Sequence, residues 1–95
     1  ETAPPPLAAK PSFDCGKAQL AAELAICRLP GIAALDRQLA QLYRKLRDRA
    51  NAKNRNRLRD FQRTWLANRN ACGANQNCLR GSYLRQIQIL RRFTG

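Results

Sequence analysis

The chain contains no histidine and few acidic residues, and both shortages restrict the chemistry that it can perform. Histidine is the side chain whose ordinary pKa suits proton transfer near neutral pH, and it is also a frequent zinc ligand. Only 6 of the 95 residues are Asp or Glu, no second acid lies at a spacing that would pair with Asp36, and no glycine-rich phosphate loop is present. The sequence therefore predicts a non-catalytic protein without a metal or cofactor.

Long apolar runs are also missing. None approaches the roughly 20 residues that a membrane-spanning helix requires. The four cysteines are an even number in a short chain, which favours disulfides, and disulfides persist in oxidising compartments. We therefore expect a soluble domain of a periplasm or of the cell exterior, whose N-terminus follows either a lipid anchor or a cleavage site.

Positively charged residues are the most prominent feature of the composition. The chain has 18 Lys and Arg residues and a net charge of +12, which favours acidic partners such as nucleic acid, anionic lipid, wall polymers or a cleft lined by carboxylates. Cations crowd the stretch from Arg44 to Arg63, which has only two acids. A solvated face that maintains solubility is one interpretation, but we favour a surface that docks an anionic partner. Its expected contact residues are Arg44, Arg47, Arg55, Arg59 and Arg63.

Prolines cluster at the N-terminus, where residues 1–11 hold all of them except Pro30. Neither a helix nor a packed strand tolerates that density, so residues 1–11 are predicted to form an extended, polyproline-like tether. The remaining residues, 12–95, are expected to form one domain, because a chain of this length supports a single core.

Apolar residues recur in the rest of the chain at helical spacing, in four groups. Pro30 separates the first two groups, since proline ends one helix and can begin the next. A short helix is predicted from about Gln19 to Cys27, and the aromatic residues of the third group are predicted to pack in the core. The groups are Leu20, Leu24 and Cys27; Ile32, Leu35, Leu39, Leu42 and Leu46; Leu58, Phe61 and Trp65; and Leu79, Tyr83, Ile87 and Leu90.

The second and third groups are predicted to form an antiparallel hairpin. Leu46 and Leu58 are about 120° out of phase on one continuous helix, so a turn is expected near residues 51–54, where asparagines can cap. This turn places Asp36 level with Arg69, beside the apolar contact between the two helices. We expect these two side chains to form a partly buried ion pair. Tyr43 lies level with Gln62 in the same arrangement. The expected fold is all-α: a small disulfide-stapled bundle on a long helical hairpin, with a short N-terminal and a C-terminal helix.

The cysteines are predicted to act as structural staples. The local pairs Cys15–Cys27 and Cys72–Cys78 suit the spacing, although the crossed pairings are not excluded by the sequence. A fully helical path would hold Cys15 and Cys27 about 18 Å apart, so their pairing requires residues 16–18 to fold back along the first helix. Zinc binding is disfavoured because the spacings are unlike those of zinc sites and histidine is absent.

Several short motifs occur together in a specific order: F-D-C-x-K-A, A-I-C, A-x-L-D-x-x-L-x-x-x-Y, Q-x-x-W-L-x-x-R-x-x-C and C-L-x-x-x-Y. In this order they resemble the LprI-type lysozyme-inhibitor family of bacterial secreted and lipoprotein domains. Two positions depart from its pattern, Asn70 and Gln86. The motif positions are Phe13, Asp14, Cys15, Lys17, Ala18, Ile26, Cys27, Leu35, Asp36, Leu39, Tyr43, Gln62, Trp65, Leu66, Arg69, Cys72, Cys78, Leu79 and Tyr83.

The resemblance implies an exported helical domain that inhibits a cell-wall-cleaving muramidase, a lysozyme-like glycosidase. The charge alone supports an alternative, a binder of anionic envelope polymer, lipid headgroups or nucleic acid, of which nucleic acid is not favoured. The two hypotheses differ in salt dependence, because binding driven by charge weakens steeply as salt rises.

Overall fold

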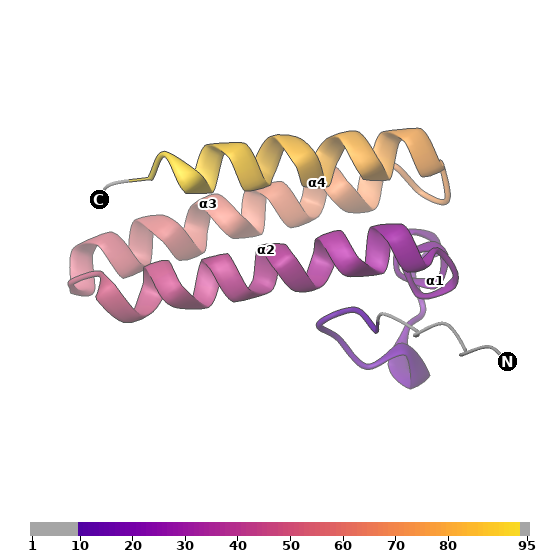
Figure 1. Cartoon of the computed structure of the whole chain (residues 1–95), viewed down its shortest axis with the longest axis horizontal. Coiled ribbons are helices and arrows are strands. Elements are labelled where there is room, and N and C mark those ends of the chain that lie inside the picture. The colour runs from indigo at the N-terminus through magenta and orange to yellow at the C-terminus, as the bar shows by residue number, and fades with distance from the viewer. Residues whose placement is uncertain (1–9, 94–95) are drawn as a thin grey trace, which may run out of the picture.

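The polypeptide runs along the long axis of the molecule three times, and a short helix crosses one end (Figure 1). The computed structural model describes residues 10–93, and within them every regular element is helical, which confirms the predicted all-α fold. The molecule measures 47 × 30 × 23 Å. Its elements are the 3-10 turn η2 (Cys15–Lys17) and the α-helices α1 (Ala21–Arg28), α2 (Pro30–Arg49), α3 (Ala52–Ala71) and α4 (Gln76–Arg91).

The helix boundaries follow from local side-chain chemistry. Pro30 occupies the first turn of α2, where a missing N–H costs nothing. Asn51 and Asn75 cap α3 and α4, because each side-chain oxygen accepts a hydrogen bond of 2.9 Å from the amide three residues ahead. Gly73, with φ of 58°, reverses the chain after α3 in a conformation that favours glycine. The predicted turn after α2 is confirmed.

The core lies where α4 packs against α2 and α3, while α1 closes one end against all three long helices. The predicted α4 stripe is buried throughout, and Ile32 and Leu39 of α2 are buried beneath it. The rest of the α2 stripe is partly buried against the same core. The buried hydrophobic residues are Ala22, Ala25, Ile26, Ile32, Ala33, Leu39, Leu58, Trp65, Leu79, Tyr83, Ile87 and Leu90.

One apolar group lies at the surface, and one prediction about the core was wrong. Leu24 of α1 and Leu20, its N-cap residue, are exposed, because a neighbouring face of small residues around Ile26 contacts the three long helices instead. On α3, Phe61 is 38% exposed, whereas Trp65 is buried. Phe61 lines surface hollows between α3 and α4 together with Ile89, so α4 leaves part of its ring exposed. The spacing placed Phe61 on the apolar side of α3 but could not tell how α4 would lie against that side.

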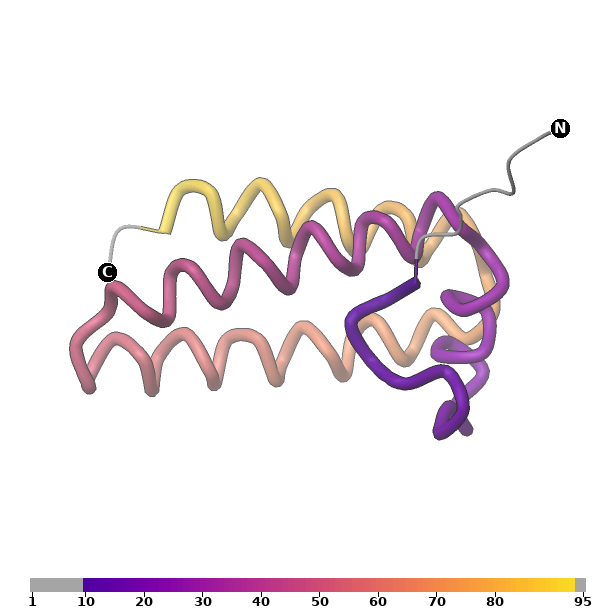
Figure 2. The backbone as a smooth tube through the Cα atoms, turned by 60° about the horizontal axis from the view of Figure 1, so that its bottom comes forward, coloured from indigo at the N-terminus to yellow at the C-terminus, as the bar shows by residue number. Residues whose placement is uncertain are grey.

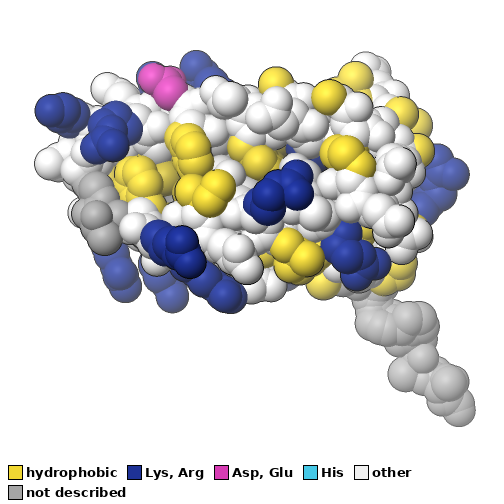
Figure 3. All heavy atoms as spheres, turned by 90° about the horizontal axis from the view of Figure 1, so that it is seen from above, with side chains coloured by type: hydrophobic (Ala, Val, Ile, Leu, Met, Phe, Trp, Pro, Cys, Tyr) yellow, Lys and Arg dark blue, Asp and Glu magenta, His cyan; other side chains and the backbone are white. Residues whose placement is uncertain are grey.

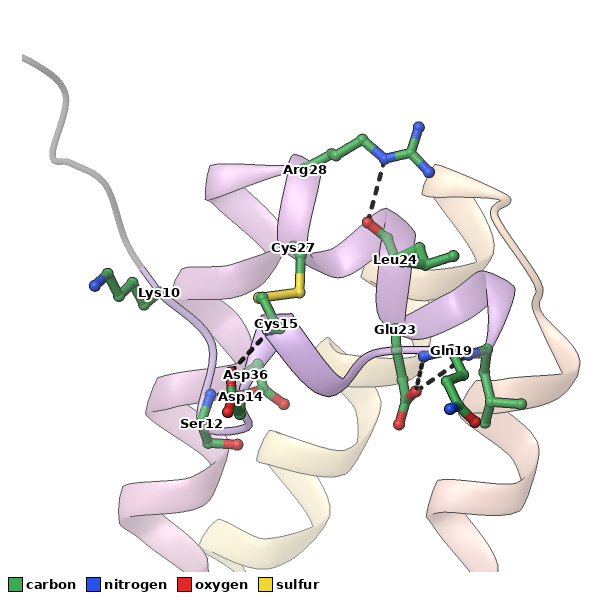
Figure 4. Close-up of a disulfide and its surroundings, with 12 residues drawn as sticks. Lys10, Ser12, Asp14, Cys15, Gln19, Glu23, Leu24, Cys27, Arg28 and Asp36 are labelled. Atoms are coloured by element: carbon green, nitrogen blue, oxygen red, sulfur yellow. Dashed lines mark hydrogen bonds between the residues drawn. A yellow bond between two sulfur atoms is a disulfide. The ribbon is translucent and has the colours of Figure 1, made fainter.

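Both local disulfides are confirmed: the Cα atoms are 6.0 Å apart in Cys15–Cys27 and 5.5 Å apart in Cys72–Cys78. Figure 4 shows the first of them, with the chain folding back through η2 before α1 begins. The Glu23 carboxylate reaches back to accept hydrogen bonds from the amides of Gln19 and Leu20. These amide donors hold the pKa of Glu23 below its ordinary value.

The N-terminal tether predicted for residues 1–11 lies mostly outside the described residues. Of its two described members, Lys10 is exposed and Pro11 is buried. None of the helices in residues 10–93 is both long and apolar enough to cross a membrane.

Candidate functional site

A groove of about 430 Å³ lies between α2 and α3. Among the described residues, α4 contributes nothing to its lining, so the groove opens on the side of the hairpin that α4 leaves uncovered. Figure 2 shows the segment before α1 passing beside the α2–α3 hairpin at the end away from its turn. Ser12 and Phe13 of this segment line the groove, which extends along α2 as far as Arg47, near the turn. It is lined by Ser12, Phe13, Glu23, Asp36, Leu39, Ala40, Tyr43, Arg44, Arg47, Gln62, Trp65, Leu66 and Arg69.

The covered end of the groove is built on a buried charged pair, Asp36 and Arg69, which are 5% and 4% exposed. The direct ion pair predicted from the hairpin register is absent from the described residues. Instead, the Tyr83 hydroxyl joins the two: it donates to Asp36 Oδ1 at 2.7 Å and accepts from Arg69 Nη1 at 3.2 Å. The register was right, but α4 inserts a tyrosine between the two charges.

The other hydrogen-bonding capacity of this pair is also satisfied. Asp36 Oδ2 accepts from the backbone N–H of Ser12, which fastens the N-terminal segment to α2. Arg69 donates from Nε and Nη2 to Asn70 Oδ1, at 3.1 and 2.7 Å. Its guanidinium carbon lies 5.7 Å from the ring centre of Phe13 and 5.8 Å from that of Trp65. A buried ion that is bonded on all sides is tolerated in a protein interior, so Arg69 acts within the fold.

Tyr83 is the member of this network that sequence reasoning missed, because it was assigned only to the apolar stripe of α4. Burial, followed by the negative charge of Asp36, raises the pKa of Tyr83 well above its ordinary value. The hydroxyl therefore stays protonated and keeps its donor role. The sequence contained a signal for this role. A tyrosine in a buried stripe needs a hydrogen-bond partner for its hydroxyl, and the buried side chains of Asp36 and Arg69 need hydrogen-bond partners as well.

Nearer the hairpin turn, the groove is edged by cations. Arg44 and Arg47 line it from α2, while Arg55 and Arg59 share the side of α3 that carries Gln62 and Leu66. The fifth predicted contact residue, Arg63, lies farther round α3, and all five are exposed. The structure thus brings four of the predicted cations to one edge of the molecule. We call Arg44, Arg47, Arg55 and Arg59 the basic rim.

The acids beside the basic rim neutralise little of it. Arg47 lies 3.7 Å from Asp48 and Arg59 lies 3.4 Å from Asp60, both between exposed side chains. Exposed pairs of this kind contribute about 0–1 kcal/mol and exchange readily with another partner. Arg55 differs, because its Nε also donates to the carbonyls of Arg47 and Ala50 at the end of α2. It therefore both carries charge and stabilises the turn.

The middle of the groove contains the second predicted pair. Tyr43 and Gln62 both line it, as the hairpin register required. Gln62 also accepts a hydrogen bond of 2.9 Å from Gln86 Nε2, which ties α3 to α4. Gln86 and Asn70 are the two positions that depart from the motif pattern, and here each bonds a residue of the groove lining.

Comparison with known protein families places the chain in one of them. The family model described as Lysozyme inhibitor LprI matches residues 14–92, which is most of the chain. The chain belongs to the LprI lysozyme-inhibitor family. The LprI match begins at Asp14, beside the first disulfide, and ends just after α4, so it includes both staples and the whole α2–α3 hairpin. No curated protein and no solved structure matches the chain significantly.

Proposed function

We propose that this protein inhibits a lysozyme-type muramidase by binding the enzyme's cleft with the basic end of the α2–α3 hairpin. The observation that carries the proposal is the LprI family match over residues 14–92. The basic rim supplies the chemistry: the clefts of such glycosidases contain two carboxylates, and arginine binds carboxylates through paired hydrogen bonds. Occupying those carboxylates blocks access to the glycan.

The spacing of the cations supports this proposal. Arg44 and Arg47 are three residues apart on α2, so their Cβ atoms lie about 5–6 Å apart on one side of the helix. The paired carboxylates of glycosidases lie about 5–9.5 Å apart. Two neighbouring guanidinium groups can therefore reach two carboxylates at once, with Arg59 available from the facing helix.

The hairpin end is also well ordered for insertion. Asn51 caps α3 directly after the turn, and Arg55 bonds back to the last carbonyls of α2. A preorganised loop loses less conformational entropy on binding than a flexible one. The turn lies at a narrow end of an elongated molecule, which suits insertion into a cleft (Figure 1).

The net charge narrows the choice of enzyme. At +12, this chain is repelled at long range by a strongly basic muramidase and associates with it slowly. We therefore propose that its target is an acidic or neutral muramidase. A binder of anionic polymer would instead lose its affinity broadly as salt rises.

The test is a titration of the protein against muramidases of differing charge, at low and at high salt, with turnover of peptidoglycan as the readout. We expect saturable inhibition of an acidic or neutral enzyme that persists at high salt. Replacing three rim residues, Arg44→Gln, Arg47→Gln and Arg59→Gln, should weaken inhibition by about 100-fold, because each substitution removes a guanidinium group that can bind the carboxylates of the enzyme.

A matched control loses the same charge at the opposite end of the bundle, through Lys17→Gln, Arg28→Gln and Arg80→Gln. It should inhibit within about threefold of the parent protein, since only long-range attraction is reduced. Equal loss in both triple variants would refute the rim as the contact surface. If no muramidase is inhibited while peptidoglycan and DNA binding disappear at high salt, the protein is a polyanion binder.

A further inference from the structure

A second surface, formed by α3 and α4, has no role in the proposed inhibition. Phe61 is 38% exposed and Ile89 is 46% exposed, although both are large apolar side chains. With Phe93 they line a hollow of about 500 Å³. An adjoining hollow of about 220 Å³ shares Phe61 and Ile89 and continues along the same two helices. We call the surface formed by Phe61, Ile89 and Phe93 the α3–α4 patch.

Arginines surround the α3–α4 patch. Arg57 lines the larger hollow and Arg85 lines the smaller one. Arg92 is exposed and is the C-cap residue of α4, three residues after Ile89 and next to Phe93. Figure 3 shows this face, with apolar side chains gathered between Lys and Arg groups and few acids. The acid that lines the patch, Asp60, already bonds Arg59.

The charge and size of the patch decide what can occupy it. A second copy of the chain is disfavoured, because two patches ringed by arginine in molecules of charge +12 repel each other. A stable protein partner normally covers about 800 Å² on each side, which three partly buried side chains do not provide. An anionic membrane needs no matching shape, since its headgroups rearrange around arginines and its interface accepts shallow aromatic and aliphatic side chains.

We propose that the α3–α4 patch docks this protein on the surface of membranes that contain anionic phospholipid. Phe61, Ile89 and Phe93 enter the interfacial region, and Arg57, Arg85 and Arg92 bind lipid phosphates around them. The hairpin turn that carries the basic rim stays outside the bilayer. The α2–α3 groove opens on the side that α4 leaves uncovered, so an enzyme can be bound while the protein sits on the membrane.

The test is co-sedimentation with vesicles of phosphatidylglycerol mixed with phosphatidylcholine, compared with vesicles of phosphatidylcholine alone. We expect binding only to the anionic vesicles. The triple variant Arg57→Gln, Arg85→Gln and Arg92→Gln should lower the partition coefficient by on the order of 100-fold, since each arginine near an anionic surface contributes about fivefold. Phe61→Ser with Ile89→Ser should lower it about tenfold, because their exposed area no longer leaves water.

Two matched triple variants isolate the patch from general charge loss: the basic-rim variant and the opposite-end variant described above. Both remove three cations, so each should bind anionic vesicles more tightly than the patch variant does. The patch variant should still inhibit muramidase, which separates the two surfaces. Circular dichroism checks that each variant folds, as expected for substitutions at exposed positions.

The proposal is overturned by any of three results. The first is an absence of binding to anionic vesicles. The second is equal loss of binding in all three triple variants, or no effect of the two serine substitutions, because either means that charge alone acts. The third is concentration-dependent dimerisation in sedimentation equilibrium that Ile89→Ser abolishes, which would assign the patch to a second copy of the chain.

Discussion

The Tyr83 hydroxyl holds the centre of the buried network, and removing that one oxygen tests the reasoning directly. In Tyr83→Phe the ring remains in place, but Asp36 Oδ1 loses its donor and Arg69 Nη1 loses its acceptor. A hydrogen bond to a charged group contributes about 1.5–3 kcal/mol, and both charged partners are buried. We therefore expect the free energy of unfolding to fall by about 3 kcal/mol.

The assay is urea unfolding of the oxidised protein, followed by far-ultraviolet circular dichroism. For a domain of this size, a loss of about 3 kcal/mol corresponds to a melting temperature lower by about 15 °C. The slope of free energy against urea should stay unchanged, because the fold is kept. Tyr43→Phe is the matched control, because Tyr43 is half-buried and takes no part in the hydrogen bonds that join Asp36, Tyr83 and Arg69.

The control substitution should cost less than about 0.5 kcal/mol, as is usual away from a buried network. A cost below about 1 kcal/mol for Tyr83→Phe would refute the bridging role of the hydroxyl. It would mean that Asp36 and Arg69 close the gap and pair directly, as the hairpin register alone had suggested.

Two further predictions concern pH and the first disulfide. Because burial raises the pKa of Tyr83 above its ordinary value near 10, the unfolded state loses this proton first as pH rises. The free energy of unfolding should therefore fall by about 1.4 kcal/mol per pH unit above about pH 10, a loss that urea titrations should find smaller in Tyr83→Phe. Replacing Cys15 and Cys27 by alanine should cost about 3 kcal/mol in urea unfolding and speed hydrogen exchange of the Ser12 amide, which bonds Asp36. Unchanged exchange at Ser12 would show that this disulfide does not hold the segment over the groove.

Much of the fold could be predicted because local chemistry specifies it. The phase shift between Leu46 and Leu58, with Asn51 as a cap, sets the hairpin turn and therefore the register that places Asp36 level with Arg69. The cysteine spacings favoured the two local pairs that the structure contains. Four of the five predicted contact arginines share one edge for the same reason, since register within a hairpin follows directly from its turn.

The sequence by itself thus determined the long helices, the hairpin turn and the basic end of the hairpin, because each depends on residues a few positions apart, and it favoured the two local disulfides without excluding the crossed pairings. Only the tertiary structure decided where α4 lies on the hairpin. That placement puts the Tyr83 hydroxyl between two charges, leaves Phe61 at an exposed edge and opens the groove on the other side. Helix packing joins residues far apart in the chain, and no local spacing specifies which ridge of α4 meets which groove of α2 and α3.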